Sequence, residues 1–173
     1  MFICGSGLVE KGLDSCLDFF IENDMQLDIC APERGYEDFW NHYSSKLENN
    51  IIRHGFVDIK SRAFKRIAAN CHFVISNSHS EGFNTAISTA MRTGLIPILT
   101  KSTGHKIGNF GILIGDTSKI ALEDAIKSAE KLTHNQLQLM SEESYKESLK
   151  YSHEEFSSSF LSCLSSFEDE FKV

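Results

Sequence analysis

The sequence of 173 residues lacks the features that assign many proteins to a class at once. Its apolar runs, such as 72–76 and 94–99, are far shorter than the roughly 20 residues that a membrane-spanning helix needs. Met1 leads directly into an apolar stretch, without a basic segment or a cleavage-like site, so no signal peptide is predicted. No basic cluster stands out, and the net charge is -7. This composition argues against nucleic acid as the main partner.

The cysteines and histidines form no disulfide framework and no zinc site. The five cysteines are odd in number and show no C-x-x-C spacing, which favours reduced thiols in a cytoplasmic protein. Cys4 and Cys30 lie in apolar runs and are expected to be small core residues. No zinc-ligand spacing is found among the cysteines and histidines, and no metal site is predicted.

Both common nucleotide-binding motifs are absent as well. Gly5 and Gly7 begin a G-x-G-x-x-G pattern, but its third glycine falls on Glu10, and no G-x-x-x-x-G-K-[ST] sequence is present. A glycine turn remains, followed by Lys11 just before an expected helix. Lys11 is either a solvated lysine at a helix start or part of an anion site that charge and helix dipole both favour.

Short apolar stretches alternate along the chain with stretches of helical periodicity. This alternation predicts an α/β fold, a Rossmann-like doubly wound parallel sheet of about six strands with helices on both faces. No repeat and no low-complexity linker divides the chain, and a helical extension over 152–171 carries an aromatic stripe that includes Phe167 and Phe171. The expected strands are 1–6, 26–32, 51–57, 72–78, 95–100 and 111–116; the expected helices are 11–24, 35–50, 61–70, 83–92, one capped by Thr117, and 134–151.

Ligands of such sheets bind outside the carboxyl ends of the strands. This rule selects the loops 5–12, 30–36, 56–60 and 77–85, of which the last is the most specific. We expect Gly82 to open a helix there, with a buried stripe formed by Phe83, Ala86, Ile87, Ala90 and Met91. The backbone amides of Gly82, Phe83, Asn84 and Thr85 would then face a phosphate. Beside them, Glu81 suits sugar hydroxyls, or a capping role if nothing binds.

Four segments give the chain a resemblance to a known family. The segments 5–14 (GSGLVEKGLD), 54–57 (HGFV), 80–100 (SEGFNTAISTAMRTGLIPILT) and 151–156 (YSHEEF) occur in an order and spacing that resemble the C-terminal, donor-binding domain of retaining GT-B glycosyltransferases of family 4. The resemblance covers nearly the whole chain. It implies that residues 1–173 form the nucleotide-sugar-binding half of a GT-B fold, without the N-terminal acceptor domain.

The resemblance also implies roles for individual residues. Lys11 would hold the diphosphate and Glu81 the hydroxyls of the donor sugar, and these two are the catalytic candidates. Phe56 and Val57 would border the nucleobase. The remaining candidates for substrate binding are Gly5, Ser6, Gly7, His79, Gly82, Phe83, Asn84, Thr85 and Thr89. No cofactor and no obligatory metal is implied, because lysine and helix dipole would meet the charge of the diphosphate.

Two positions depart from the family's pattern. Thr89 stands where a second glutamate usually grips the ribose, and Ser6 stands where an arginine usually contacts the diphosphate. We therefore expect weaker or differently arranged nucleotide binding, and the choice of nucleotide stays open.

The function that the resemblance implies is glycosyl transfer. A hexosyl or N-acetylhexosaminyl group would pass with retention from a nucleotide sugar, UDP-linked rather than GDP-linked, to a glycan or lipid-linked acceptor, as in bacterial O-antigen, lipopolysaccharide or capsule synthesis. The full enzyme would be cytoplasmic, or peripheral at the inner membrane face, and the isolated fragment inactive. Two alternatives stay open: a non-catalytic nucleotide-sugar-binding domain, and a nucleotide-sugar epimerase of GT-B architecture.

Overall fold

A single parallel sheet organises the chain. The computed structural model describes residues 1–171, with side chains through 166, and across this range six strands pair in the order β3-β2-β1-β4-β5-β6, every pair parallel. The predicted fold class and strand number are thereby confirmed. The strands are β1 (Phe2–Ile3), β2 (Leu27–Cys30), β3 (Ile51–Arg53), β4 (Phe73–Ser76), β5 (Ile96–Thr100) and β6 (Ile112–Ile114).

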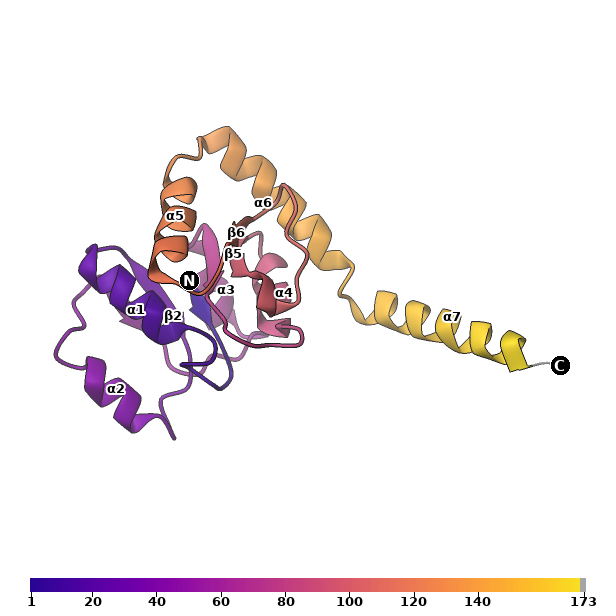
Figure 1. Cartoon of the computed structure of the whole chain (residues 1–173), viewed down its shortest axis with the longest axis horizontal. Helices are drawn as coiled ribbons and strands as arrows, with labels where there is room; N and C mark the ends of the chain where they lie inside the picture. The colour runs from indigo at the N-terminus through magenta and orange to yellow at the C-terminus, as the bar shows by residue number, and fades with distance from the viewer. Residues whose placement is uncertain (172–173) are drawn as a thin grey trace.

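Helices cover both faces of the sheet (Figure 1). Side chains from α1, α2 and α5 form a core on one face with residues of the sheet, and side chains from α3 and α4 form a second core on the other. The α6 helix packs against α4 and β5. The helices are α1 (Leu13–Glu22), α2 (Glu37–Tyr43), α3 (Arg62–Ala69), α4 (Thr85–Met91), α5 (Lys119–Glu130), α6 (His134–Leu149) and α7 (His153–Phe171), with a short 3-10 turn, η1 (Lys101–Thr103).

The apolar character of the strands follows from this layering. Every residue of β5 is buried, as are the last three of β4, because both faces of a central parallel strand are covered by helices. Cys4 and Cys30 are buried as expected, and burial raises the pKa of each thiol to about 12. Both are therefore neutral core residues.

Several elements are shorter than the sequence pattern predicts. The helix expected over 35–50 covers only Glu37–Tyr43, because the carbonyl of Tyr43 accepts hydrogen bonds from two following amides and the chain turns away. The strand expected over 51–57 ends at Arg53, before Gly55 at a φ of 68°. The cap of α5 is Ser118 rather than the expected Thr117, since the Ser118 hydroxyl accepts from the Ala121 amide.

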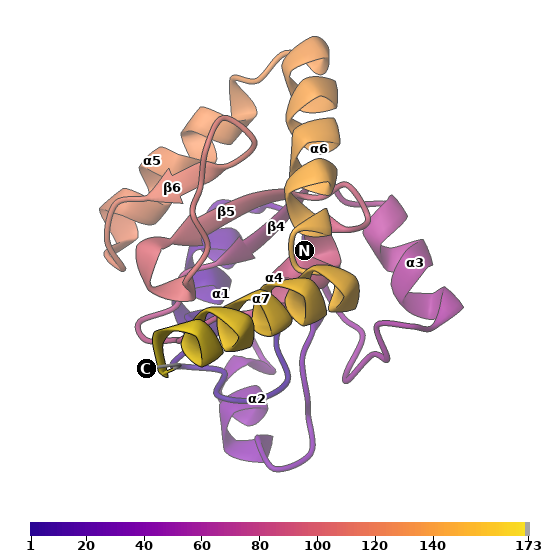
Figure 2. The same cartoon turned by 90° about the vertical axis from the view of Figure 1, so that its right-hand side faces the viewer.

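The C-terminal helix α7 extends away from the rest of the chain in Figure 1, and in Figure 2, which looks from that side, it lies in front of the other elements. It begins at His153, next to the expected start at 152. Its large apolar side chains Phe156, Phe160 and Leu164 are exposed. The side chains of Phe167 and Phe171, which complete the expected aromatic stripe, lie outside the described residues.

Gly12 fixes the start of α1 against the end of β4. It has a φ of 76°, and a Cβ atom there would lie 2.2 Å from the Asn77 carbonyl oxygen. Gly35 has a similar φ of 84°, but a Cβ atom at that position would meet nothing within 4 Å. The two glycines therefore share a left-handed backbone and differ in steric surroundings.

We expect Gly12→Ala to lower the free energy of unfolding by about 3 kcal/mol or more, because backbone strain and a backbone clash add. Gly35→Ala, which adds strain alone, should cost about 1 kcal/mol. Urea unfolding of both variants measures the difference. Equal losses of unfolding free energy in the two variants would show that contact with the Asn77 carbonyl does not constrain Gly12.

Candidate functional site

The strand order creates a switch point between β1 and β4. From β1 the chain proceeds outward through β2 to β3, and then returns to place β4 on the opposite side of β1. The loops after β1 and β4 therefore diverge at the carboxyl edge of two neighbouring strands. Open α/β sheets bind their ligands in the crevice at this position.

An ion pair joins these two loops. The Lys11 Nζ atom lies 2.6 Å from Glu81 Oε1, and the two side chains are only 19% and 12% exposed. The second carboxylate oxygen, Glu81 Oε2, is buried without a hydrogen-bond partner among the described residues. The structure thus brings together the two residues singled out as catalytic candidates, and leaves one oxygen available to a further donor.

Backbone contacts hold the pair in place. The His79 amide donates to the Glu10 carbonyl oxygen at 2.9 Å, and the Ser78 hydroxyl donates to the same oxygen at 3.2 Å. These bonds lie close to Lys11 and Glu81 in the sequence. The distance between the two charged groups is consequently set by the backbone as well as by their mutual attraction.

A cavity of about 220 Å³ lies at the same edge of the sheet. Gly5, Phe56 and Val57, all candidates from the sequence, line it together with the backbone or side chains of Ile3, Cys4, Cys30, Asp58, Ile59 and Ala86. Phe56 is exposed and Val57 is partly buried. The lining is mostly apolar, which suits a planar ring system more than a charged group.

The start of α4 differs from the expectation. The helix begins at Thr85 rather than at Gly82, and the Asn84 side chain caps it by accepting from the amides of Ala86 and Ile87. The Asn84 amide, expected to face a phosphate, donates to the Thr103 carbonyl oxygen at 3.1 Å. Asn84 is therefore occupied by the fold at both its side chain and its amide. This correction arises because an asparagine at this position satisfies the helix start by itself.

Phe83 also departs from the expected buried stripe. Ile87, Ala90 and Met91 are fully buried, but Phe83 is 39% exposed. Its ring stacks on His105, with the ring centroids 4.3 Å apart. No pattern in the sequence indicates this partner, since His105 stands in a turn region without periodicity.

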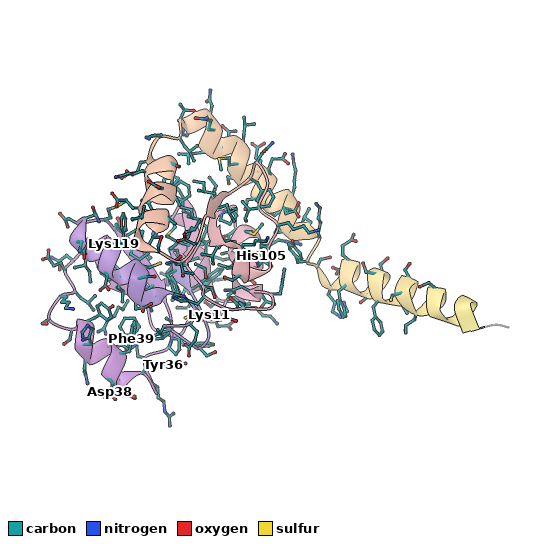
Figure 3. The ribbon with its side chains drawn as sticks, in the orientation of Figure 1. Lys11, Tyr36, Asp38, Phe39, His105 and Lys119 are labelled. Atoms are coloured by element: carbon teal, nitrogen blue, oxygen red, sulfur yellow. The ribbon has the colours of Figure 1, made fainter. Side chains whose placement is uncertain are left out.

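His105 is a buried, doubly hydrogen-bonded histidine. Its Nδ1 atom lies 3.1 Å from the Thr103 carbonyl oxygen and its Nε2 atom 3.0 Å from the Ser88 hydroxyl. Because a carbonyl only accepts, Nδ1 carries the proton, and Nε2 accepts from Ser88. Burial lowers the pKa of His105 below its usual value. Figure 3 shows where the side chains of His105 and Lys11 lie in the fold.

The remaining candidates are spread around this edge. The Gly7 amide donates to the Tyr36 hydroxyl at 2.7 Å, which ties the first loop to the start of α2. Ser6 and His79 are exposed. Thr89 donates its hydroxyl to the Thr85 carbonyl oxygen at 3.1 Å and lines a separate hollow of about 370 Å³. Thr85 and Thr89 are thus not brought to the cavity lined by Phe56.

The fold is similar to that of several solved structures, although the sequence alone matches none of the known families. No protein-family model and no curated protein matches the sequence. Among solved structures, the Anabaena protein HepE in complex with UDP and glucose aligns with a TM-score of 0.70 at 17% identity, over 85% of this chain and 42% of that one. The GtfA/B complex aligns with a TM-score of 0.74 at 20% identity, over 97% and 36%. The pneumococcal O-GlcNAc transferase GtfA in complex with UDP and GlcNAc aligns with a TM-score of 0.67 at 20% identity, over 95% of this chain and 35% of that one.

The chain has the fold of one half of a GT-B glycosyltransferase. It spans less than half of the length of each of these solved chains. No helix among the described residues of this GT-B half is both long and apolar enough to cross a membrane. Among the same residues, no three histidine, cysteine, aspartate or glutamate side chains gather in a metal-binding group.

The buried His105 predicts a pH dependence of stability. Its pKa in the folded state lies below the value of 6.5 that it has when unfolded, so the unfolded state binds the proton first. The part of the free energy of unfolding that depends on neutral His105 is at its full value above pH 6.5. It is lost as the pH falls below 6.5, by at most about 1.4 kcal/mol per pH unit.

Urea unfolding between pH 7.5 and 5.5 tests this expectation. His105→Gln, which stays neutral, should flatten the loss of stability below pH 6.5 relative to the unaltered chain. His79→Gln, a matched change at an exposed histidine, should leave the slope as it is. Identical slopes for all three proteins would contradict the role of His105.

Proposed function

We propose that this chain is the donor-binding half of a glycosyltransferase, and that it binds a nucleotide sugar at the Lys11–Glu81 pair. The observation that carries the proposal is the position of this pair, partly buried at the switch point between β1 and β4. The adjacent cavity lined by Phe56 and Val57 supports it by offering an apolar recess for a base. The similar fold of HepE, which was solved with UDP and glucose, also supports it.

The two charged groups would take different parts of the donor. The Lys11 ammonium would leave Glu81 and bind the diphosphate, with which it forms charge-assisted hydrogen bonds. Glu81 would then accept hydrogen bonds from the hydroxyls of the sugar, beginning with Oε2, which has no partner among the described residues. A carboxylate would be repelled by phosphate, so the division of roles follows from charge.

The amides before α4 would assist Lys11. Those of Gly82, Phe83 and Thr85 donate to no acceptor in the part of the chain that the structure describes. They lie close in sequence to Glu81, at the end of a loop that reaches the carboxyl edge of the sheet. We propose that they contact the phosphate end of the donor, a contact from which the Asn84 amide is withdrawn by Thr103.

In the proposed reaction, the bond between the sugar's anomeric carbon and the diphosphate oxygen breaks. A bond from the same carbon to the acceptor's hydroxyl oxygen forms, and the proton of that hydroxyl passes to the leaving diphosphate oxygen, which takes the electron pair of the broken bond. The leaving diphosphate gains negative charge, which Lys11 and the nearby amides would stabilise without an obligatory metal. We propose a UDP-linked hexose or N-acetylhexosamine as donor, transfer with retention, and a glycan or lipid-linked acceptor.

A non-catalytic nucleotide-sugar-binding domain is the second candidate. Thr89, in the position of the family's second glutamate, is engaged with the Thr85 carbonyl oxygen and lies away from the cavity lined by Phe56. Ribose would therefore lack a carboxylate partner at this point. Either candidate requires a second domain for transfer, because acceptor and donor must be held in reacting geometry; we propose that the isolated chain binds donors without transferring sugar.

Calorimetric titration of the chain with UDP, UDP-glucose and UDP-N-acetylglucosamine tests the assignment. Lys11→Met should weaken binding of all three by about tenfold or more, since a charge-assisted hydrogen bond contributes about 1.5–3 kcal/mol. Glu81→Gln should raise the affinity for UDP, because Lys11 no longer has to leave a carboxylate and the phosphate is no longer repelled. The same variant should lose most of the additional affinity for the UDP-sugars.

The control is Lys127→Met, which removes a lysine from an exposed ion pair with Glu123 on α5. It changes the net charge equally and should not alter binding. If the unaltered chain binds none of the three compounds at millimolar concentration, the proposed function is wrong. If Lys11→Met and Lys127→Met behave alike, the assignment of the diphosphate to Lys11 is wrong.

A further inference from the structure

Three aromatic rings meet beside the loop that carries Glu81. Phe83 stacks on His105 at 4.3 Å between ring centroids, and Tyr151 approaches Phe83 at 4.9 Å and His105 at 5.7 Å. We call these residues the aromatic trio. They come from three parts of the chain: the start of α4, the loop after η1, and the junction of α6 with α7. Such a meeting is a tertiary contact between segments that are distant in sequence.

His105 gives the trio a fixed base. It is 5% exposed, and both ring nitrogens have hydrogen-bond partners, the Thr103 carbonyl oxygen and the Ser88 hydroxyl. A ring that is held at both nitrogens cannot turn without breaking a buried hydrogen bond. Phe83 therefore rests on a plane whose orientation is set by the fold.

The segment 100–105 also holds the Glu81 loop at both ends. Before Glu81, the Ser78 carbonyl oxygen accepts from the hydroxyls of Thr100, at 2.8 Å, and of Ser102. After it, the Asn84 amide donates to Thr103. These bonds leave the residues between Ser78 and Asn84 as the part of the loop whose position depends on other contacts.

Gly104 brings the two segments into close contact at the middle of this loop. It has a φ of 79°, and a Cβ atom there would lie 2.2 Å from the Gly82 carbonyl oxygen. Gly82 follows Glu81 directly. The backbone next to the carboxylate is therefore placed against the 100–105 segment.

Phe83 is a partly exposed residue of this loop. It is 39% exposed, and the rings of His105 and Tyr151 pack against it. Tyr151 is itself 38% exposed and belongs to the turn between α6 and α7. Without the Tyr151 ring, Phe83 would lose its cover on one side, and the backbone of Gly82 and Glu81 would gain freedom.

We propose that His105 and Tyr151 are positioning residues for Glu81, which act through Phe83, and that the Tyr151 ring links sugar recognition to the α6–α7 junction. This inference rests on the proposed function. The effect is expected to be largest on the sugar, because the aromatic trio lies beside Glu81, whereas Lys11 and the cavity lined by Phe56 belong to other loops. Loss of the Tyr151 ring should therefore reduce the preference for UDP-sugars over UDP.

Tyr151→Leu is the test variant, and two others accompany it. Tyr151→Phe keeps the ring and should behave like the unaltered chain. Tyr145→Leu makes the same substitution on α6, at a tyrosine that is 44% exposed and stands under the guanidinium of Arg92 at 5.8 Å, outside the aromatic trio. A general effect of losing an exposed tyrosine would appear in both leucine variants.

The first measurement needs no ligand. Hydrogen exchange of the peptide that covers 79–85, followed by mass spectrometry, should become about threefold to tenfold faster in Tyr151→Leu and remain unchanged in Tyr151→Phe and Tyr145→Leu. Unchanged exchange in Tyr151→Leu would overturn the inference, whatever the chain binds. This result is independent of the proposed function.

The second measurement is the ratio of the dissociation constants for UDP and UDP-glucose. Tyr151→Leu should weaken UDP binding through the amides of Gly82 and Phe83, and weaken UDP-glucose binding further through Glu81, so that this ratio falls by about threefold to tenfold. His105→Gln, which removes the ring, should act in the same direction. An equal loss for UDP and UDP-glucose, or an unchanged ratio, would overturn the positioning role, whereas an unaltered chain that binds neither compound would refute the proposed function instead.

Discussion

The close contact between the loops after β1 and β4 is the constraint on which the rest of the site depends. Gly12 lets the first loop approach the Asn77 carbonyl, and the Glu10 carbonyl accepts hydrogen bonds from the second loop. Lys11 stands between Glu10 and Gly12, and its side chain leaves this contact toward Glu81. The glycine is needed because any side chain there would separate the two loops and the two charges with them.

The Lys11–Glu81 pair differs from the other lysine–glutamate pairs of the described chain. The pairs on α5 and α6, such as Lys127–Glu123 and Lys146–Glu143, are exposed and follow the helical spacing of three or four residues. Such exposed pairs contribute little to stability, because water screens their attraction. Lys11 and Glu81 are partly buried and come from different loops, so water screens their attraction less. Removing either partner leaves a partly buried charge unpaired, which costs more free energy than at the surface. A ligand that offers both a phosphate and hydroxyls can replace both partners at once.

The helix that follows Glu81 shows how the same small residues serve packing and access. Ile87, Ala90 and Met91 are fully buried against the sheet and α6, while Asn84 closes the helix start without a charged group. Ser88 uses its hydroxyl on His105. The scarcity of charge on α4 is thus explained by burial on one side and by the segment that carries His105 on another. The acidic group, Glu81, lies in the loop in front of the helix.

Hydrophobic periodicity was sufficient to predict the fold class and the number of strands. The rule that parallel strands bring their following loops to one edge placed the loops of Lys11 and Glu81 at that edge. The pairing of Lys11 with Glu81 and the cavity shared by Gly5, Phe56 and Val57 could be seen only in the folded chain. The same holds for the start of α4, the withdrawal of the Asn84 amide and the aromatic trio. Those depend on Thr103, His105 and Tyr151, which are far from Glu81 in sequence, and local propensity carries no information about which distant side chain reaches a given loop.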